Sequence, residues 1–114
     1  ITLIFEESGI FELNIDSILC EMMINNLLKN AFTHNKEIGE IKIEISKDEI
    51  VISNSGKETS LNEKLIFNYF YKESKEKNST GLGLVLIKTI CKKHNLGIDY
   101  QFVEKKHRFI ITKK

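Results

Sequence analysis

The sequence NNLLKNAFTH, residues 25–34, decides the fold because it places Asn26 and Asn30 one turn apart on a helix. Apolar residues recur around these asparagines at the spacing of one helical face, and Asp16 precedes them as a good N-cap, so we predict an amphipathic helix over residues 17–34. The apolar stripe consists of Leu19, Met23, Ile24, Leu27, Leu28, Ala31 and Phe32. Both amides then lie on the same side of the helix, where their oxygens can meet a cation or a phosphate group.

A second run, STGLGL at residues 79–84, places two glycines at the start of another predicted helix. That helix is expected to run from Leu82 to about His94, where Asn95 and Gly97 are stop signals. Backbone N–H groups at a helix N-terminus favour a negatively charged group, and the glycines leave room for it. The asparagine pair and the glycine run together predict a nucleotide site.

Six short strands are predicted around the two helices, and a long polar connection over residues 55–80 precedes the second helix. The predicted strands are residues 2–5 and 11–14, which form an opening hairpin around a turn at Ser8 and Gly9, then 40–45 and 49–54, which pair antiparallel, and finally 98–103 and 107–112. An aromatic segment, residues 65–71, interrupts the polar connection. This order predicts an α+β fold, a two-layer α/β sandwich in which a mixed, mostly antiparallel sheet carries the helices on one face.

The length of 114 residues suits one domain, 1–114, with one hydrophobic core. A net charge of +1 gives no electrostatic case for nucleic acid or an anionic membrane as the main partner. Cys20 and Cys91 fall within apolar helical patterns without metal-type spacing, so we expect reduced thiols and a cytoplasmic location. No apolar run reaches the roughly 20 residues that span a bilayer. Because the chain starts without Met and directly in a strand pattern, we expect a domain of a longer protein.

Four runs in fixed order resemble the four conserved boxes of the histidine-kinase ATP-binding domain. They are NLLKNA at 26–31, SNSG at 53–56, FNYFYK at 67–72 and TGLGL at 80–84. The resemblance covers essentially the whole chain. It implies the ATP-binding sandwich (Bergerat fold) of the superfamily that contains gyrase, heat-shock chaperones, histidine kinases and mismatch-repair proteins, with a lid between the third and fourth boxes.

The resemblance implies that the side-chain oxygen of Asn30 binds Mg²⁺, which takes most of its other ligands from the triphosphate and water. Asn26 stands where hydrolysing relatives carry a glutamate that activates water. An amide cannot accept that proton, so the intrinsic hydrolysis of ATP should be slow. The γ-phosphate then stays available for transfer to a histidine nucleophile. The alternative is that Asn26 and Asn30 merely cap neighbouring loops.

Asn54 occupies the position at which the family usually has an aspartate that reads the adenine amino group. An amide oxygen can accept the same hydrogen bond without the assistance of charge, so we expect weaker nucleotide affinity. Gly56 keeps the first glycine of this box, whereas Glu58 replaces the second. Taken alone, the run from Asn54 to Gly56 is equally compatible with a plain turn that ends a strand.

The resemblance also suggests which residues face the phosphates. Thr33 stands where many relatives carry a phosphate-facing lysine, which leaves His34 and Lys72 as candidates for positive charge. Alternatively, His34 is a helix-end histidine favoured by the helix dipole, and Lys72 is a solvated surface lysine.

The glycine box places Thr80, Gly81, Leu82 and Gly83 at the phosphate tail. A dinucleotide-binding fold is excluded because its third glycine would stand at Leu86 and a strand would have to precede the run. A glycine-rich helix start without a ligand remains as the alternative.

No histidine in the chain is followed by the acidic, hydrophobic and basic pattern of a phosphoacceptor site. We therefore expect the acceptor histidine on a helical dimerisation domain of the same kinase, with a response regulator as an indirect partner and the full-length protein in the inner (cell) membrane. The cofactors implied are ATP and Mg²⁺, and no contact with nucleic acid or membrane is expected from this domain. Two alternatives are a degenerate relative acting as a scaffold and a serine kinase acting on an anti-anti-sigma protein.

Overall fold

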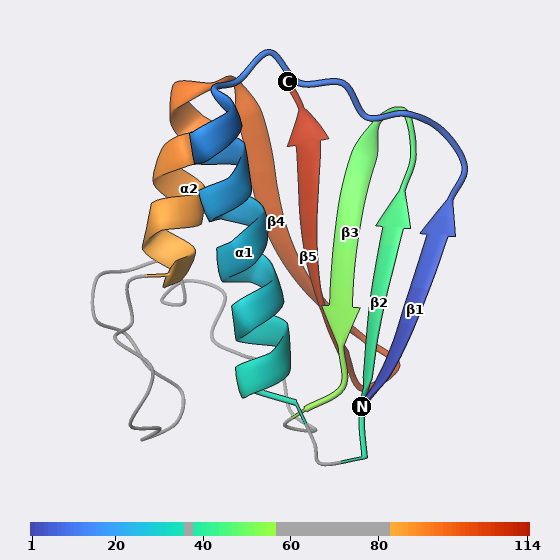
Figure 1. Ribbon diagram of the computed structural model, residues 1–114. Helices are drawn as coiled ribbons and strands as arrows, with labels where there is room; N and C mark the ends of the chain where they lie inside the picture. The colour runs from blue at the N-terminus through green and yellow to red at the C-terminus, as the bar shows by residue number, and fades with distance from the viewer. Residues whose placement is uncertain (36–37, 57–82) are drawn as a thin grey trace.

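The computed structural model describes residues 1–35, 38–56 and 83–114 as one five-stranded sheet with both helices on the same face (Figure 1). The elements are β1 (Thr2–Glu7), α1 (Ser17–Thr33), β2 (Glu40–Ile45), β3 (Glu49–Asn54), α2 (Gly83–Lys93), β4 (Leu96–Val103) and β5 (Lys106–Lys113). The strand order is β1-β2-β3-β5-β4, and only the β1–β2 pair is parallel. The predicted α+β two-layer sandwich with a mixed, mostly antiparallel sheet is confirmed.

The predicted opening hairpin is wrong. β1 pairs in parallel with β2, from Thr2 opposite Glu40 to Glu7 opposite Ile45, and residues 11–14 form no strand. In Figure 1 the segment after β1 crosses the end of the sheet to reach α1. Its alternating side chains nevertheless pack half-buried against the core, namely Phe11, Leu13 and Ile15. The alternation of apolar and polar residues shows which side chains face the core, but it does not show that the segment pairs with another strand.

Helix α1 begins where the sequence predicts, since the Asp16 carboxylate accepts a 2.8 Å hydrogen bond from the Ile18 N–H. It ends at Thr33, and the N–H of the next residue, His34, donates to the Asn30 carbonyl at 3.1 Å. Its buried stripe repeats every four residues and consists of Met23, Leu27 and Ala31. The described part of α2 begins at Gly83, and its buried face consists of Val85, Ile87, Ile90 and Cys91.

The core lies between the two helices and the sheet, where apolar side chains from α1, α2 and every strand except β1 interdigitate. Cys91 and Met23 join the helices through a contact of 3.7 Å between their sulfur atoms.

Both cysteines are free, as predicted. Burial raises the pKa of the Cys91 thiol to about 11, so this thiol stays protonated at neutral pH. Within residues 1–35, 38–56 and 83–114, neither helix has the length and hydropathy that a bilayer crossing requires.

The four remaining predicted strands are confirmed, with small changes at their ends. β4 starts at Leu96, two residues earlier than predicted, directly after Asn95, whose positive φ of 57° ends the helical segment. β4 and β5 pair from Val103 opposite Lys106, so only Glu104 and Lys105 form the turn between them. Both turn residues have positive φ, the conformation typical of tight two-residue hairpins.

Candidate functional site

Three segments that are distant in sequence meet near the C-terminal end of α1. They are the last turns of α1, the residues that follow β3, and the first residue of α2. In Figure 1, α1 and β3 run in the same direction and finish at the same end of the molecule. Two glycines, Gly56 and Gly83, form the contacts with α1.

Gly56 lies directly against the end of α1. A Cβ atom at this position would clash with the backbone carbonyl oxygen of His34. Since a backbone carbonyl at a helix end cannot rotate away as a side chain can, only glycine allows this approach. The contact brings His34 and Thr33, both half-buried, to the segment that contains Asn54.

Gly83, the first residue of α2, lies against Asn26. A Cβ atom on Gly83 would stand 3.2 Å from the Asn26 side-chain oxygen. The Asn26 Nδ2 donates a 2.7 Å hydrogen bond to the carbonyl of Met22 in the same helix. Because a carbonyl can only accept, this bond identifies the nitrogen of the amide and leaves Oδ1 facing the start of α2. Among the described residues, the Asn26 amide thus bonds to its own helix and not to a loop.

Asn30 lies on α1 between these two contacts, one turn after Asn26 and one turn before His34. Its side chain is half-buried and makes no hydrogen bond in the part of the chain that the structure describes. The amide oxygen is thus available at the centre of the region bounded by Gly83 and Gly56.

Asn54 is the last residue of β3, and its side chain is only 3% exposed. Its Nδ2 donates a 2.7 Å hydrogen bond to the carbonyl of Ser55. On the neighbouring strand β5 it is paired with His107, which is 4% exposed. The His107 Nδ1 and the Tyr100 hydroxyl are joined by a 2.7 Å hydrogen bond. The core therefore becomes polar at the end of the sheet that faces the last turn of α1.

A hydrogen-bonded cluster of Asn35, Glu40 and Ser55 ties the same end of the molecule together. The Ser55 Oγ donates to the Asn35 Oδ1 at 2.6 Å and accepts from the Glu40 N–H at 2.7 Å. The Asn35 Nδ2 and the Ser55 N–H both donate to the Glu40 carbonyl, at 2.9 and 3.1 Å. Gly39 makes room for this cluster, because a Cβ atom there would clash with the Asn35 Oδ1.

Sequence reasoning missed Asn35 and His107 as parts of this region, and it gave Ser55 no role of its own within the run at 53–56. For His107 a signal was present, because it shares the alternating pattern of Phe109 and Ile111 and so belongs on the core face of β5. No local pattern indicates the Asn35–Ser55 hydrogen bond, which joins residues 20 positions apart.

The structure places seven of the eleven predicted site residues in this region, and the other four fall outside the described residues. Asn26, Asn30, His34, Gly56 and Gly83 lie around the last turns of α1, with Asn54 beside Gly56 and Thr33 beside His34. The predicted residues Lys72, Thr80, Gly81 and Leu82 fall outside the described residues.

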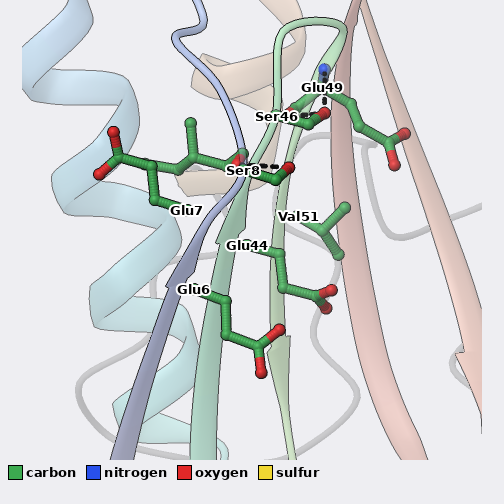
Figure 2. A pocket seen from close by; sticks show the side chains of 8 residues that line it. Glu6, Glu7, Ser8, Glu44, Ser46, Glu49 and Val51 are labelled. Atoms are coloured by element: carbon green, nitrogen blue, oxygen red, sulfur yellow. Dashed lines mark hydrogen bonds between the residues drawn. The ribbon is translucent and has the colours of Figure 1, made fainter.

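A surface hollow lies at the opposite end of β3 and does not suit a triphosphate (Figure 2). Four glutamates line it, together with two serines and two apolar residues: Glu6, Glu7, Glu44, Glu49, Ser8, Ser46, Ile45 and Val51. Carboxylates at this density repel a polyanion. No group of three or more metal-type side chains occurs among residues 1–35, 38–56 and 83–114.

Comparison with known proteins assigns the chain to a family. The model of the histidine kinase-, DNA gyrase B- and HSP90-like ATPases matches residues 15–114. The chain is 33% identical over 104 residues to the sensor histidine kinase HprS of Escherichia coli (strain K12), covering 85% of this chain and 23% of HprS. It is 38% identical over 87 residues to the heme sensor protein HssS of Staphylococcus aureus (strain Newman), covering 72% of this chain and 19% of HssS. The chain thus spans about a fifth of the length of these relatives.

Solved structures of histidine kinases share the fold. The mycobacterial sensor histidine kinase MprB superimposes with a TM-score of 0.80 at 21% identity, over 96% of this chain and 79% of that chain. The nucleotide-free catalytic domain of the histidine kinase ThkA gives a TM-score of 0.78 at 27% identity, over 96% of this chain and 77% of that chain.

The sandwich fold and these similarities define a histidine-kinase-type ATP-binding domain. The chain belongs to the family of histidine kinase-, DNA gyrase B- and HSP90-like ATPases. The resemblance indicated by the four sequence runs is confirmed.

The contact between Gly56 and His34 predicts a selective effect of added side chains. Gly56→Ala should lower the free energy of unfolding by about 2 kcal/mol, because the helix-end carbonyl cannot move without unwinding α1. Gly97→Ala is the matched control, since the nearest atom to its added Cβ is the Thr112 Oγ1 at 2.9 Å, and a side chain can rotate. Urea denaturation measures both variants, and equal stability of the two would contradict the prediction.

Proposed function

We propose that this domain binds ATP as its Mg²⁺ complex and donates the γ-phosphate to a histidine on a separate helical domain of the same kinase, in two-component signal transduction. Membership of the ATPase family supports the nucleotide. The observation that carries the proposal is the position of Asn30 on α1, between the contact of Asn26 with Gly83 and the contact of His34 with Gly56.

Asn30 is the proposed ligand of Mg²⁺. Its half-buried amide is not used by any hydrogen bond within the described ranges, and amide oxygens suit this hard cation. A bound Mg²⁺ would supply positive charge that stabilises the phosphates during transfer. Asn30 contributes the fixed oxygen that positions the metal complex on α1.

The start of α2 is the proposed binding site of the phosphate tail. Backbone N–H groups at a helix N-terminus attract anions, and Gly83 leaves the approach open on the side of Asn26. Thr80, Gly81 and Leu82 are proposed to continue this binding segment. Thr33, His34 and Lys72 are proposed to lie near the phosphates.

The chemistry of Asn26 favours transfer of the γ-phosphate to histidine over its transfer to water. Its nitrogen donates to the Met22 carbonyl, and its oxygen belongs to a neutral amide that cannot take a proton at neutral pH. Water at this position is therefore not activated, whereas an imidazole attacks without a base on this domain.

Asn54 and Gly56 are proposed to form the end of the site that holds the nucleobase. The remaining parts of the kinase are also proposals, because the chain covers 23% of HprS and 19% of HssS. We propose that residues 1–114 form one catalytic domain on the cytoplasmic side of a kinase held in the inner membrane. Its partners would be the helical dimerisation domain and, indirectly, a response regulator.

Removal of the Asn30 amide should abolish Mg²⁺-dependent binding. Asn30→Ala is expected to weaken ATP binding at least tenfold, roughly 1.4 kcal/mol, while thermal unfolding stays close to that of the wild type. Asn30→Asp is expected to lose binding as well. Isothermal titration calorimetry with Mg²⁺ and ATP measures the affinity. Asn25→Ala, which changes an exposed asparagine on the same helix, is the matched control. Unchanged ATP affinity in Asn30→Ala would remove the assignment.

Phosphotransfer is tested in the full-length kinase. Incubation with γ-labelled ATP should give an acid-labile, alkali-stable phosphate on the protein, which is the behaviour of phosphohistidine. The label should disappear in Asn30→Ala and persist in Asn25→Ala. A protein that binds ATP without labelling itself would instead be the degenerate scaffold, and an acid-stable label on a separate protein would indicate a serine kinase.

A further inference from the structure

We propose that the open edge of β1 pairs antiparallel with the same edge of a second copy of this chain, so that two five-stranded sheets join about a two-fold axis at Ile4. The proposal goes beyond nucleotide binding and does not depend on it. The position of β1 in the sheet, the direction of its backbone groups and the order of its side chains all lead to this pairing.

β1 is an edge strand whose apolar side chains lie outside the hydrophobic core. In Figure 1 it forms the edge of the sheet that neither helix covers. Leu3 and Phe5 stand opposite Ile41 and Ile43 of β2, so they lie on the face that packs against the helices. Leu3 is nevertheless 60% exposed and Phe5 58%, whereas Ile41 is fully buried. β1 thus presents apolar surface that no described element covers.

The opposite edge strand, β4, shows how the same sheet protects an edge. The core face of β4 packs under α2, and its Leu96 and Tyr100 are buried, while Asp99 places a charge on the other face. β1 pairs with β2 in unbroken register, without a bulge, a proline or a lysine, and its charged residues, Glu6 and Glu7, stand only at its end. An uncovered edge of this kind is a template for pairing with another strand.

The backbone groups of β1 that point to the open side belong to its odd-numbered residues. The N–H of Thr2 donates to the Gly39 carbonyl at 2.8 Å, so the even-numbered residues of β1 direct their backbone groups toward β2. Because these groups alternate along a strand, Leu3 and Phe5 direct theirs away from β2. Among the strands of the described ranges, none pairs with β1 on that side.

Antiparallel pairing centred on Ile4 matches these backbone groups with the side chains. Leu3 of each copy then stands opposite Phe5 of the other, and the two residues exchange both backbone hydrogen bonds. Their side chains form apolar cross-strand pairs on the helix face of the sheet. On the other face Ile4 stands opposite its own copy and Thr2 stands opposite Glu6. No carboxylate faces another carboxylate in this register.

Other registers of the same pairing are less favourable. A two-fold axis at Phe5 would place Leu3 opposite the Glu7 carboxylate, and an axis at Glu6 would bring the two copies of that carboxylate face to face. An axis at Leu3 would pair Ile4 with Thr2 and shorten the paired region within residues 1–7. The axis at Ile4 therefore pairs the most of β1 without opposing charges.

Engineered cysteines test the register directly. In a non-hydrogen-bonded antiparallel pair the Cα atoms lie about 4.5 Å apart, which a disulfide can span, so Ile4→Cys should give a linked dimer on mild oxidation. Thr2→Cys and Glu6→Cys should each stay unlinked alone, because each lies about 14 Å from its own copy. A mixture of these two variants should crosslink. All variants also carry Cys20→Ser, and the remaining Cys91 is only 1% exposed.

Sedimentation equilibrium without nucleotide measures the association of the wild-type chain. Its mean mass should rise toward that of a dimer as concentration rises into the millimolar range, since a single strand pair is a small interface. Phe5→Lys should weaken dimerisation at least tenfold, because it places a charge opposite Leu3. Val103→Lys is the matched control on the opposite edge strand, where Val103 is 43% exposed, and it should leave dimerisation unchanged.

The proposal is overturned by a wild-type chain that stays monomeric up to millimolar concentration, or by Thr2→Cys alone crosslinking as readily as Ile4→Cys. Loss of the dimer in Val103→Lys but not in Phe5→Lys would also overturn it, because the pairing edge would then be β4. Should Phe5→Lys not fold, judged by circular dichroism, the cysteine variants still decide. No nucleotide is present in these experiments, so their failure would leave the proposed function intact.

Discussion

The close approach of Gly56 to the carbonyl oxygen of His34 is the contact on which the rest of the site depends. It sets the spacing between the last turn of α1 and the end of β3, and no residue with a Cβ atom allows it. The buried stripe of Met23, Leu27 and Ala31 holds α1 against the core along its length. The stripe and the contact together place Asn26 against the start of α2 and Asn30 one turn further along α1, toward the contact of His34 with Gly56.

Local carbonyl groups orient two neutral amides of the candidate site. Asn26 donates to the Met22 carbonyl and Asn54 donates to the Ser55 carbonyl, both at 2.7 Å. In each case the bond of the amide nitrogen fixes the direction of the amide oxygen. An oriented amide is a fixed acceptor without charge, which suits the proposed binding of a polyanion without activation of water.

The sequence predicted the parts of the fold that rest on periodic burial. Both helices and five strands were predicted correctly because their apolar residues repeat with helical or strand spacing. The same signal failed at residues 11–14, since alternation shows which side chains face the core and not which strand is paired. Local motifs predicted that Asn26 and Asn30 lie one turn apart on a helix and that Gly83 begins another helix, and the structure shows Gly83 beside Asn26. His107 and the Asn35–Ser55 hydrogen bond depend on strand register and tertiary contact, which no short sequence pattern reveals.

The central claim is that the end of α1, the end of β3 and the start of α2 bind one nucleotide together. An amide NMR titration with Mg²⁺ and a non-hydrolysable ATP analogue tests it most directly. The account predicts that the resonances of Asn30, Asn54, Gly56 and Gly83 shift with one common dissociation constant, while those of Glu44 and Glu49 at the far end of the sheet stay in place. Shifts confined to the glutamate-lined hollow, or separate affinities at the three segments, would contradict it.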